Sequence, residues 1–299
     1  MGGGPLGPED RPQSAWIPEV TETEMGIGVV GAGPMGQAIA RRLASSGEPP
    51  GLIFSRTRAQ AGVLADEIGW QVAGSAGDLV ARSPLTLLAV PGSQLERLVA
   101  QLGVELGSAA LPRRRVVAHC AGAVGPRPLF PLRRLGCMVA VFHPLAPVPD
   151  GQPSCLDDTY VSIEAEPGAR AQLQALALKL GLRPFLVENL DRPLYHAAAV
   201  FAAVLTVLVE SLGERLVLEA GAGEEAVSAL RSLLAASARN VERLGPQRGL
   251  SGPQRRGDAD TVGSHLEALD RVDPALGRLY RSIHEAAREN RPTHRAEES

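Results

Sequence analysis

The chain has 299 residues, of which 44% are hydrophobic and 21% charged, and its net charge at neutral pH is −3. The length is enough for two domains, and the composition is that of an ordinary globular protein. The near-neutral charge and the aromatic content of 3% argue against nucleic acid as a partner, because such surfaces use clustered cations or rings on which bases stack.

The cysteines and the apolar runs indicate the cellular compartment of the protein. Cys120, Cys137 and Cys155 contain no C-x-x-C pair, so we expect a reducing compartment and no disulfide framework. The longest apolar run, 197–209, has 13 residues, fewer than the roughly 18 that a membrane span needs, and it predicts a buried helix. We therefore expect a cytoplasmic protein without membrane contact.

The first residues differ in composition from everything that follows. Residues 1–24 are rich in Gly, Pro and acidic side chains and lack the charged-then-apolar order of a secretory signal. They predict a disordered tail, and Met25, directly before the first apolar run, is an alternative start of the protein. The last residues, 291–299, predict a second tail.

From residue 26 the chain alternates short apolar runs with amphipathic segments, which is typical of βαβ units. Strands are expected at 26–30, 51–55, 70–73, 85–91, 114–122, 137–144, 159–165 and 183–188, and helices at 34–47, 58–68, 93–103 and 169–181. The pattern predicts an α/β fold with a mostly parallel sheet over 25–189.

Near residue 190 the pattern becomes helical throughout. Helices are expected over 191–219 and 224–244, followed by a loop that turns into a helix over 249–269 and a last helix over 273–290. The change predicts a domain boundary, with an all-α C-terminal domain over 190–290 that serves dimerisation or substrate binding.

The glycines of the first expected strand–helix turn have the spacing of a dinucleotide-binding loop. Gly31, Gly33 and Gly36 form G-x-G-x-x-G, with Pro34 and Met35 between the last two. The first glycine allows the tight turn, the second lets backbone approach a pyrophosphate, and the third permits close helix–strand packing. The turn therefore predicts a dinucleotide site, and the alternative is a glycine-rich turn without a ligand.

The residues at the end of the second expected strand indicate which dinucleotide the site binds. An Asp or Glu there would bind the ribose 2′-hydroxyl of NAD, whereas this chain has Ser55 and Arg56, which suit the 2′-phosphate of NADP(H). The alternative is a capped helix start with solvated arginines. Val90 and Pro91, after the fourth expected strand, should pass beneath the nicotinamide half.

Candidate proton donors follow the next strands, because open α/β sheets bind ligands beyond the carboxyl ends of their strands. His119 follows the apolar stretch "RRVVA" and His143 follows "VAVF", and Tyr195 and His196 open the apolar helix at the domain boundary. A histidine can donate a proton near neutral pH. The alternatives are a loop-shaping role for His119 and for His143, and ordinary core positions for Tyr195 and His196.

The stretch 250–266, "LSGPQRRGDADTVGSHL", is the most unusual of the second half. Arg255 and Arg256 are able to clamp a carboxylate, which favours an acidic substrate, and Asp258 or Asp260 can cap the following helix. The alternative is a capped helix start with solvated arginines. No metal-ligand spacing is present in the sequence, so we expect no metal.

Several stretches together resemble a bacterial family of Rossmann-like oxidoreductases with a helical C-terminal domain of unknown function. The stretches are "GVVGAGPMGQAIA", "AHCAGAVG", "FHPLAPVPD", "LYHAAAVFAA" and "LSGPQRRGDADTVGSHLEAL". The family is related to pyrroline-5-carboxylate reductase, ketopantoate reductase and β-hydroxyacid dehydrogenases. The resemblance implies an NADP-binding Rossmann domain, a helical domain that forms a homodimer, and functional roles for His143, Tyr195, His196, Arg256 and Asp258.

One position departs from the pattern that the resemblance implies. A polar Asn is expected near Val204, and valine cannot donate a hydrogen bond to a substrate or carboxamide. The main hypothesis is an NADP(H)-dependent oxidoreductase that acts on a small keto or imino acid, or on the corresponding hydroxy or amino acid. Val204 keeps open the alternative of an NADP(H)-binding sensor or regulatory protein without catalysis.

Overall fold

The computed structural model describes residues 26–107, 111 and 114–289. The expected tails at 1–24 and 291–299, and Met25 as an alternative start, lie outside these residues. Contacts divide the chain into two compact units, Met1–Leu205 and Thr206–Ser299, and each unit is described by itself.

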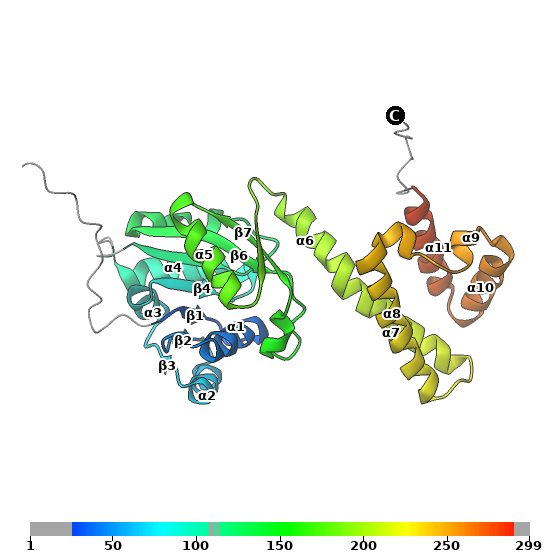
Figure 1. The fold of residues 1–299 in the computed structure, drawn as a ribbon, viewed down its shortest axis with the longest axis horizontal. Helices are drawn as coiled ribbons and strands as arrows, with labels where there is room; N and C mark the ends of the chain where they lie inside the picture. Colours follow the sequence, from blue (N-terminus) through cyan, green and yellow to red (C-terminus); the bar gives the residue numbers. More distant parts are fainter. Residues whose placement is uncertain (1–25, 108–110, 112–113, 290–299) are drawn as a thin grey trace, which may run out of the picture. The chain divides into compact units, whose positions relative to one another are not determined.

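The first unit is built on one eight-stranded sheet with the strand order β3-β2-β1-β4-β5-β6-β7-β8 (Figure 1). All neighbouring strands are parallel except β6 and β7, which are antiparallel. This arrangement confirms the expected Rossmann-type, mostly parallel sheet. The strands are β1 (Gly28–Val30), β2 (Leu52–Phe54), β3 (Gln71–Val72), β4 (Leu85–Leu88), β5 (Arg115–His119), β6 (Cys137–Pro144), β7 (Tyr160–Ala165) and β8 (Arg183–Leu186).

Helices cover both faces of the sheet, so neighbouring strand residues enter different cores. Val29 belongs to the core that α1 (Pro34–Ser45), α2 (Arg58–Ile68) and α5 (Pro167–Lys179) help to form. Val30 belongs to a second core, which includes α3 (Ala76–Arg82), α4 (Leu95–Leu106) and the 3-10 helix η2 (Arg127–Leu135). Burial on both faces explains why the strands read as continuous apolar runs rather than as alternating patterns.

Three short elements of this unit were not expected from the sequence, namely α3, η2 and η3 (Pro153–Leu156). A signal for α3 was present, because Ser75 accepts a hydrogen bond from the Asp78 backbone N–H as an N-cap. Two expected strands, 85–91 and 114–122, are shorter in the structure. They end at Leu88 and His119, and the residues that follow line pockets instead of continuing the sheet hydrogen bonds.

The apolar segment after residue 190 forms α6 (Arg192–Val200), a π-helical turn η4 (Phe201–Leu205) and α7 (Thr206–Glu219). The expectation of a buried helix is wrong for this chain, because Phe201 is 70% exposed and Val207 is 66% exposed. The 13-residue apolar run is part of a longer continuous helix, Arg192–Glu219. The helix runs past both ends of the apolar run, and its 28 residues suffice for a membrane span by length and composition.

The second unit is helical, as expected. It comprises α7, α8 (Glu224–Gly249), α9 (Pro253–Arg256), α10 (Ala259–Val272) and α11 (Pro274–Glu289). Helix α7 packs against α8, with Arg231 donating to Glu214 at 2.6 Å, and α10 packs against α11. The helix expected to end near residue 244 continues past a kink at Gly245, which has φ +73° and is followed by Pro246.

Candidate functional site

The glycine turn between β1 and α1 has the geometry that its spacing predicts. Gly31 has φ +113°, a conformation that favours glycine. A Cβ on Gly36 would lie 1.9 Å from the Gly31 carbonyl oxygen, so this glycine permits the close helix–strand approach. A Cβ on Gly33 would meet no protein atom within 4 Å. The space beside Gly33 is therefore open to a ligand at the N-terminus of α1, where free N–H groups favour phosphate.

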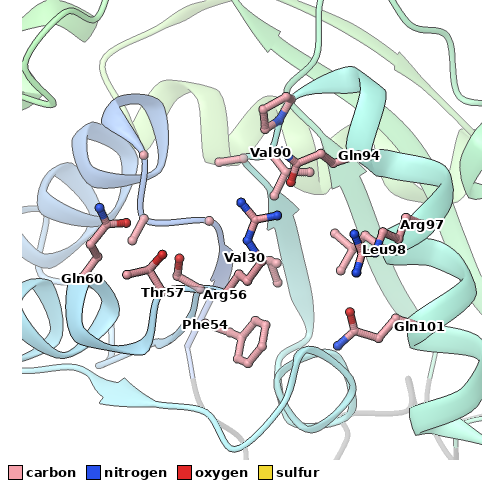
Figure 2. A pocket seen from close by; sticks show the side chains of 16 residues that line it. Val30, Phe54, Arg56, Thr57, Gln60, Val90, Gln94, Arg97, Leu98 and Gln101 are labelled. Carbon is pink, nitrogen blue, oxygen red and sulfur yellow. The ribbon is translucent and has the colours of Figure 1, made fainter.

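A cavity of about 380 Å³ lies beside this turn (Figure 2). Its walls are the glycine turn, the end of β2 with Ser55, Arg56 and Thr57, the end of β4 with Val90 and Pro91, and one face of α4. Arg56 has no ion-pair or hydrogen-bond partner among the described residues, so its charge is available to a ligand. Six of the predicted nucleotide-site residues line this cavity, namely Gly31, Gly33, Ser55, Arg56, Val90 and Pro91. Pro34 and Met35 line a neighbouring cavity instead, and Gly36 lines neither. We call the first cavity the adenosine pocket.

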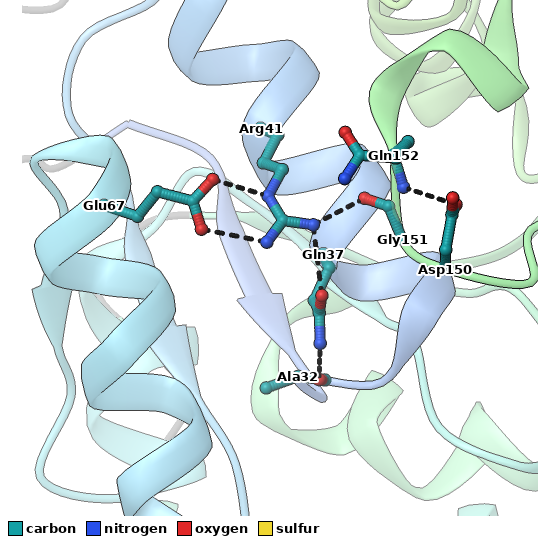
Figure 3. Close-up of polar contacts among 7 residues, drawn as sticks. All are labelled: Ala32, Gln37, Arg41, Glu67, Asp150, Gly151 and Gln152. Carbon is teal, nitrogen blue, oxygen red and sulfur yellow. Dashed lines mark hydrogen bonds and ion pairs between the residues drawn. The ribbon is translucent and has the colours of Figure 1, made fainter.

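Side-chain contacts hold the outer side of the glycine turn (Figure 3). Gln37 on α1 donates to the Ala32 carbonyl at 2.9 Å, and Arg41 donates to the Gln37 side-chain oxygen at 3.1 Å. Arg41 also donates to both carboxylate oxygens of Glu67 on α2, at 2.7 and 2.8 Å, and to the Gly151 carbonyl at 2.7 Å. We call this set the Arg41 clamp. It joins the turn to the loop that follows β6.

A second cavity, of about 450 Å³, adjoins the adenosine pocket. Gly33, Ala89, Val90 and Pro91 line both cavities. The remaining walls are mostly apolar, and the ionisable side chains among its lining residues are Cys120, His143 and His196. Burial raises the pKa of the Cys120 thiol to about 12, which makes this cysteine a poor nucleophile. We call this second cavity the reaction pocket. Its two histidines are therefore the side chains that can move protons.

His143, Tyr195 and His196 lie together in the first unit. The rings of His143 and His196 are 5.7 Å apart, and the Tyr195 hydroxyl lies 3.5 Å from His143 Nδ1. A Cβ on Gly122 would lie 2.5 Å from His143 Nε2 and 2.6 Å from His196 Nδ1. Both nitrogens thus converge on Gly122. His196 Nδ1 is buried and has no hydrogen-bond partner among the described residues.

The surroundings of His143 favour the neutral imidazole. Burial lowers its pKa to about 4, and the charges of His196, Arg192 and His119 act in the same direction. Arg192 is 3% exposed and donates to Glu164 at 2.8 Å and to Ser162 at 3.3 Å.

The strand register explains how Arg192 reaches His143. Ser162 faces His143 across the β6–β7 pair, and Glu164 faces Val141 two residues earlier, so these side chains share one face of the sheet. Arg192 lies over that face, and its guanidinium carbon is 5.7 Å from the Tyr195 ring centre. The Arg192–Glu164 pair thereby fixes the start of α6, from which Tyr195 and His196 extend.

His119 has the loop-shaping geometry rather than that of a proton donor. It is fully buried, its Nε2 is 3.0 Å from the Gly125 carbonyl, and the Ala121 N–H donates to its Nδ1. Both ring nitrogens are engaged within the 119–125 loop. Burial lowers its pKa, which suits a neutral ring that donates from Nε2.

Arg256 and Asp258 lie in the second unit. Asp258 caps α10 by accepting from the Thr261 N–H at 3.1 Å and from the Thr261 hydroxyl at 2.8 Å. These two hydrogen bonds lower the pKa of Asp258. The Asp258 carboxylate therefore has the structural role of a helix cap, which sequence analysis gave as its alternative. Arg256 is exposed, and its role as an acid anchor stays a prediction.

Sequence reasoning missed four residues that the structure brings to the site. Arg97 and Gln101 line the adenosine pocket from α4, Arg192 underlies Tyr195, and Gly122 faces both histidines. Helical spacing from Gln94 could have placed Arg97 and Gln101 on one face with it. The sequence carried no signal for Arg192 or Gly122, because their roles depend on the pairing of β6 with β7 and on the path of a loop.

Two family models match successive parts of the chain. Residues 26–119 match the model described as NADP oxidoreductase, coenzyme F420-dependent. Residues 159–287 match the model described as a domain of unknown function, which begins within the sheet and continues through the helical unit. No curated protein matches the sequence significantly.

Solved structures of similar fold cover most of the chain. A protein assigned as an NADP oxidoreductase from Bacteroides fragilis is 23% identical, with a TM-score of 0.70 over 89% of this chain and 99% of that one. A pyrroline-5-carboxylate reductase from Streptococcus pyogenes is 17% identical, with a TM-score of 0.61 over 90% and 100%. An imine reductase from Pseudomonas sp. is 16% identical, with a TM-score of 0.65 over 89% and 94%. Together with the family models, these similarities confirm the resemblance drawn from the sequence.

Proposed function

We propose that the protein is an NADP(H)-dependent oxidoreductase that acts on a small keto or imino acid, or on the corresponding hydroxy or amino acid. The observation that carries the proposal is the shared wall of the two cavities. Gly33, Ala89, Val90 and Pro91 line both, so one dinucleotide could extend from the adenosine pocket to the histidine pair. The oxidoreductase model over residues 26–119 and the reductases of similar fold support the same class of reaction.

The residues present fit NADP(H). The turn leaves open space at Gly33, and Ser55 and Arg56 replace the acidic residue that would select NAD. When bound, the nicotinamide would supply a hydride to, or accept one from, the reacting carbon of the substrate. Val90 and Pro91 would support that end of the nucleotide, and Gly31, Gly33, Pro34 and Met35 would hold the pyrophosphate. Gly36 would contribute by keeping α1 close to the strand.

The proton would come from the group around His143. The Tyr195 hydroxyl is placed to donate to His143 Nδ1, which leaves the imidazole proton on Nε2, the nitrogen that faces Gly122 and His196. Neutral His143 can then pass that proton to a substrate oxygen or nitrogen while Nδ1 takes the tyrosine proton, and the Tyr195 phenolate that remains regains a proton from solvent. His196 would orient the same substrate atom through Nδ1. The role of Arg256 as an anchor for a substrate carboxylate stays a prediction from the sequence.

The proposal is tested by titrating the protein with NADPH and NADH and then screening keto and imino acids for NADPH consumption. We expect NADPH to bind more tightly than NADH. His143→Ala and His196→Ala should each lower turnover about 100-fold, the contribution of a positioned proton donor, with NADPH affinity nearly unchanged. Unchanged turnover in both variants would refute the proton route, and failure to bind either nucleotide would refute the whole proposal.

A second candidate is an NADP(H)-binding sensor without turnover, and Val204 favours it. This residue lies in the π-helical turn and is 53% exposed, and its side chain offers no hydrogen bond where the resemblance implies an amide. Tight NADPH binding with no consumption across the acid panel would favour the sensor. Under the enzyme hypothesis, Val204→Asn should raise turnover or leave it unchanged.

We also propose a cytoplasmic homodimer with a small-molecule substrate as its ligand. The second unit exposes a group of large apolar side chains on α7 and α8, comprising Val207, Leu208, Val209, Leu218, Leu233 and Val241. Exposed apolar surface of this kind marks an interface with a protein or a membrane. A second copy of the chain would cover it on the same surface of both subunits.

A further inference from the structure

One face of α4 forms the wall of the adenosine pocket that sequence analysis did not foresee. Gln94, Arg97, Leu98 and Gln101 all line this cavity. Their spacing of three, four and seven residues places them on a single helix face. Helix α4 thus presents Arg97, Leu98 and Gln101 to the pocket. Gln94, the last residue of the 3-10 helix η1 (Gly92–Gln94) directly before α4, adds a second amide.

Figure 2 shows that Arg97 stands across the cavity from Arg56, which follows β2. Neither guanidinium has an ion-pair or hydrogen-bond partner among the described residues. The carboxylate of Glu105, farther along α4, is engaged by the Gly77 N–H at 2.6 Å and by Gln101 at 2.6 Å. The described residues that line the cavity include no Asp or Glu. The two like charges of Arg56 and Arg97 therefore share this cavity, an arrangement that an anionic ligand would stabilise.

The position of Arg56 indicates which anionic group of the nucleotide belongs between the arginines. In folds of this kind the residue after the second strand contacts the 2′ position of the adenosine ribose, whereas the pyrophosphate lies on the glycine turn. A 2′-phosphate carries up to two negative charges and three acceptor oxygens, so it can pair with two guanidiniums.

We propose that Arg97 is a second determinant of the preference for a 2′-phosphorylated nucleotide and binds the 2′-phosphate from the wall opposite Arg56. This inference rests on the proposed NADP(H) function. It assigns part of the specificity for NADP(H) over NAD to α4. That specificity is ordinarily predicted only from the residues after β2.

Adenosine 2′,5′-bisphosphate and 5′-AMP differ only in the 2′-phosphate, and calorimetric titration of the full chain with both compounds tests the role of Arg97. Arg97→Gln should weaken binding of the bisphosphate about tenfold, as expected for loss of a charged hydrogen bond, and change 5′-AMP binding less than twofold. Arg97→Lys, which keeps the charge, should retain part of the affinity. Arg134→Gln removes an exposed arginine that does not line the pocket and serves as the matched control.

Three results would overturn the assignment. An unchanged bisphosphate affinity in Arg97→Gln would show that the residue does not contact the phosphate. An equal loss for both compounds would show that it contacts the adenine or ribose instead. If the unaltered protein bound the bisphosphate no better than 5′-AMP, the proposed NADP(H) preference would fail, and the role of Arg97 would fail with it. The last result concerns the unaltered protein, whereas the first two concern the Arg97→Gln variant. Failure of the NADP(H) preference is therefore distinguishable from failure of the role of Arg97.

Discussion

At the scale of single residues, His143 couples the stability of the protein to pH. Burial lowers its pKa to about 4, whereas the unfolded chain has an ordinary histidine pKa near 6.5. Between these values the unfolded state binds the proton more readily, so stability falls as the pH drops from about 6.5 to about 4. The full difference amounts to about 3 kcal/mol.

Urea unfolding at several pH values measures this contribution. The loss of stability between pH 6.5 and pH 4 should be smaller in His143→Gln than in the unaltered protein, because glutamine does not titrate. His119 is also buried with a lowered pKa, so His119→Gln should remove a further part of the loss. An identical pH profile in the unaltered protein and in His143→Gln would contradict the neutral, buried state of His143.

Gly122 is the residue whose substitution should block the reaction pocket most directly. In Gly122→Ala the methyl group would lie within 2.6 Å of both His143 Nε2 and His196 Nδ1, so the rings must move apart. We expect turnover to be lost and NADPH affinity to change little, because Gly122 does not line the adenosine pocket. Gly125→Ala is the matched control, since a Cβ there meets nothing within 4 Å. Equal activity of the two variants would exclude a role for the space at Gly122.

At the scale of elements, the glycine turn separates a folding requirement from a binding requirement. Gly33→Ala should leave the melting temperature within about 2 °C of the unaltered protein, because its Cβ meets no protein atom and its φ of −75° suits alanine. It should weaken NADPH binding at least tenfold, since the methyl group takes the space of a phosphate. Gly36→Ala should destabilise the protein by roughly 2–3 kcal/mol, because its Cβ would lie 1.9 Å from a carbonyl oxygen.

Thermal unfolding and NADPH fluorescence titration measure the two effects separately. Weak binding by a folded Gly33→Ala protein would support the phosphate site. Unchanged affinity in that variant would show that the turn is only structural.

Local signals made several elements predictable. Helix α2 begins and ends at the expected residues, Arg58 and Ile68, where Gly69 in the left-handed conformation ends it. Strand β6 also occupies its expected range. The 3-10 helix η2 was missed because Pro128 and Pro131 within it have no place in an ordinary helix pattern.

The site residues that lie at strand ends could be predicted from the sequence. Those whose place depends on how β6 pairs with β7 could not. Arg56, Val90 and His143 follow or end parallel strands, and the sheet brings such positions to one edge. Arg192 enters the site because β7 runs antiparallel to β6 and places Ser162 opposite His143. No spacing in the sequence indicates that reversal of direction.

At the scale of the whole molecule, the exposed apolar side chains of α7 and α8 decide the oligomeric state that we propose. Leu208→Glu would place a charge in the interface and should convert a dimer, with twice the chain mass of 31.3 kDa, into a monomer. Light scattering after size exclusion measures the mass. Val63→Glu is the matched control, because Val63 is 71% exposed on α2 and belongs to the first unit. A monomeric unaltered protein would contradict the proposal.

The same side chains show why burial was mispredicted. A run such as 197–209 is apolar whether it is covered by its own chain, by a second copy or by lipid, and composition does not distinguish these environments. The structure shows that its own chain leaves Phe201 and Val207 exposed. The sequence thus predicted that the apolar surface of residues 197–209 is covered, but it did not indicate what covers it.

The Arg41 clamp has a thermodynamic consequence for the loop after β6. One guanidinium holds the Gly151 carbonyl and, through Gln37, the carbonyl of Ala32 in the glycine turn. A ligand that orders the turn should therefore also suppress local opening of the loop. Amide hydrogen exchange at Gly151 and Gln152 should slow when NADPH binds, although neither residue lines either cavity. In Arg41→Gln that remote protection should disappear, so deuterium uptake in this loop would report occupancy of the nucleotide site from a distance.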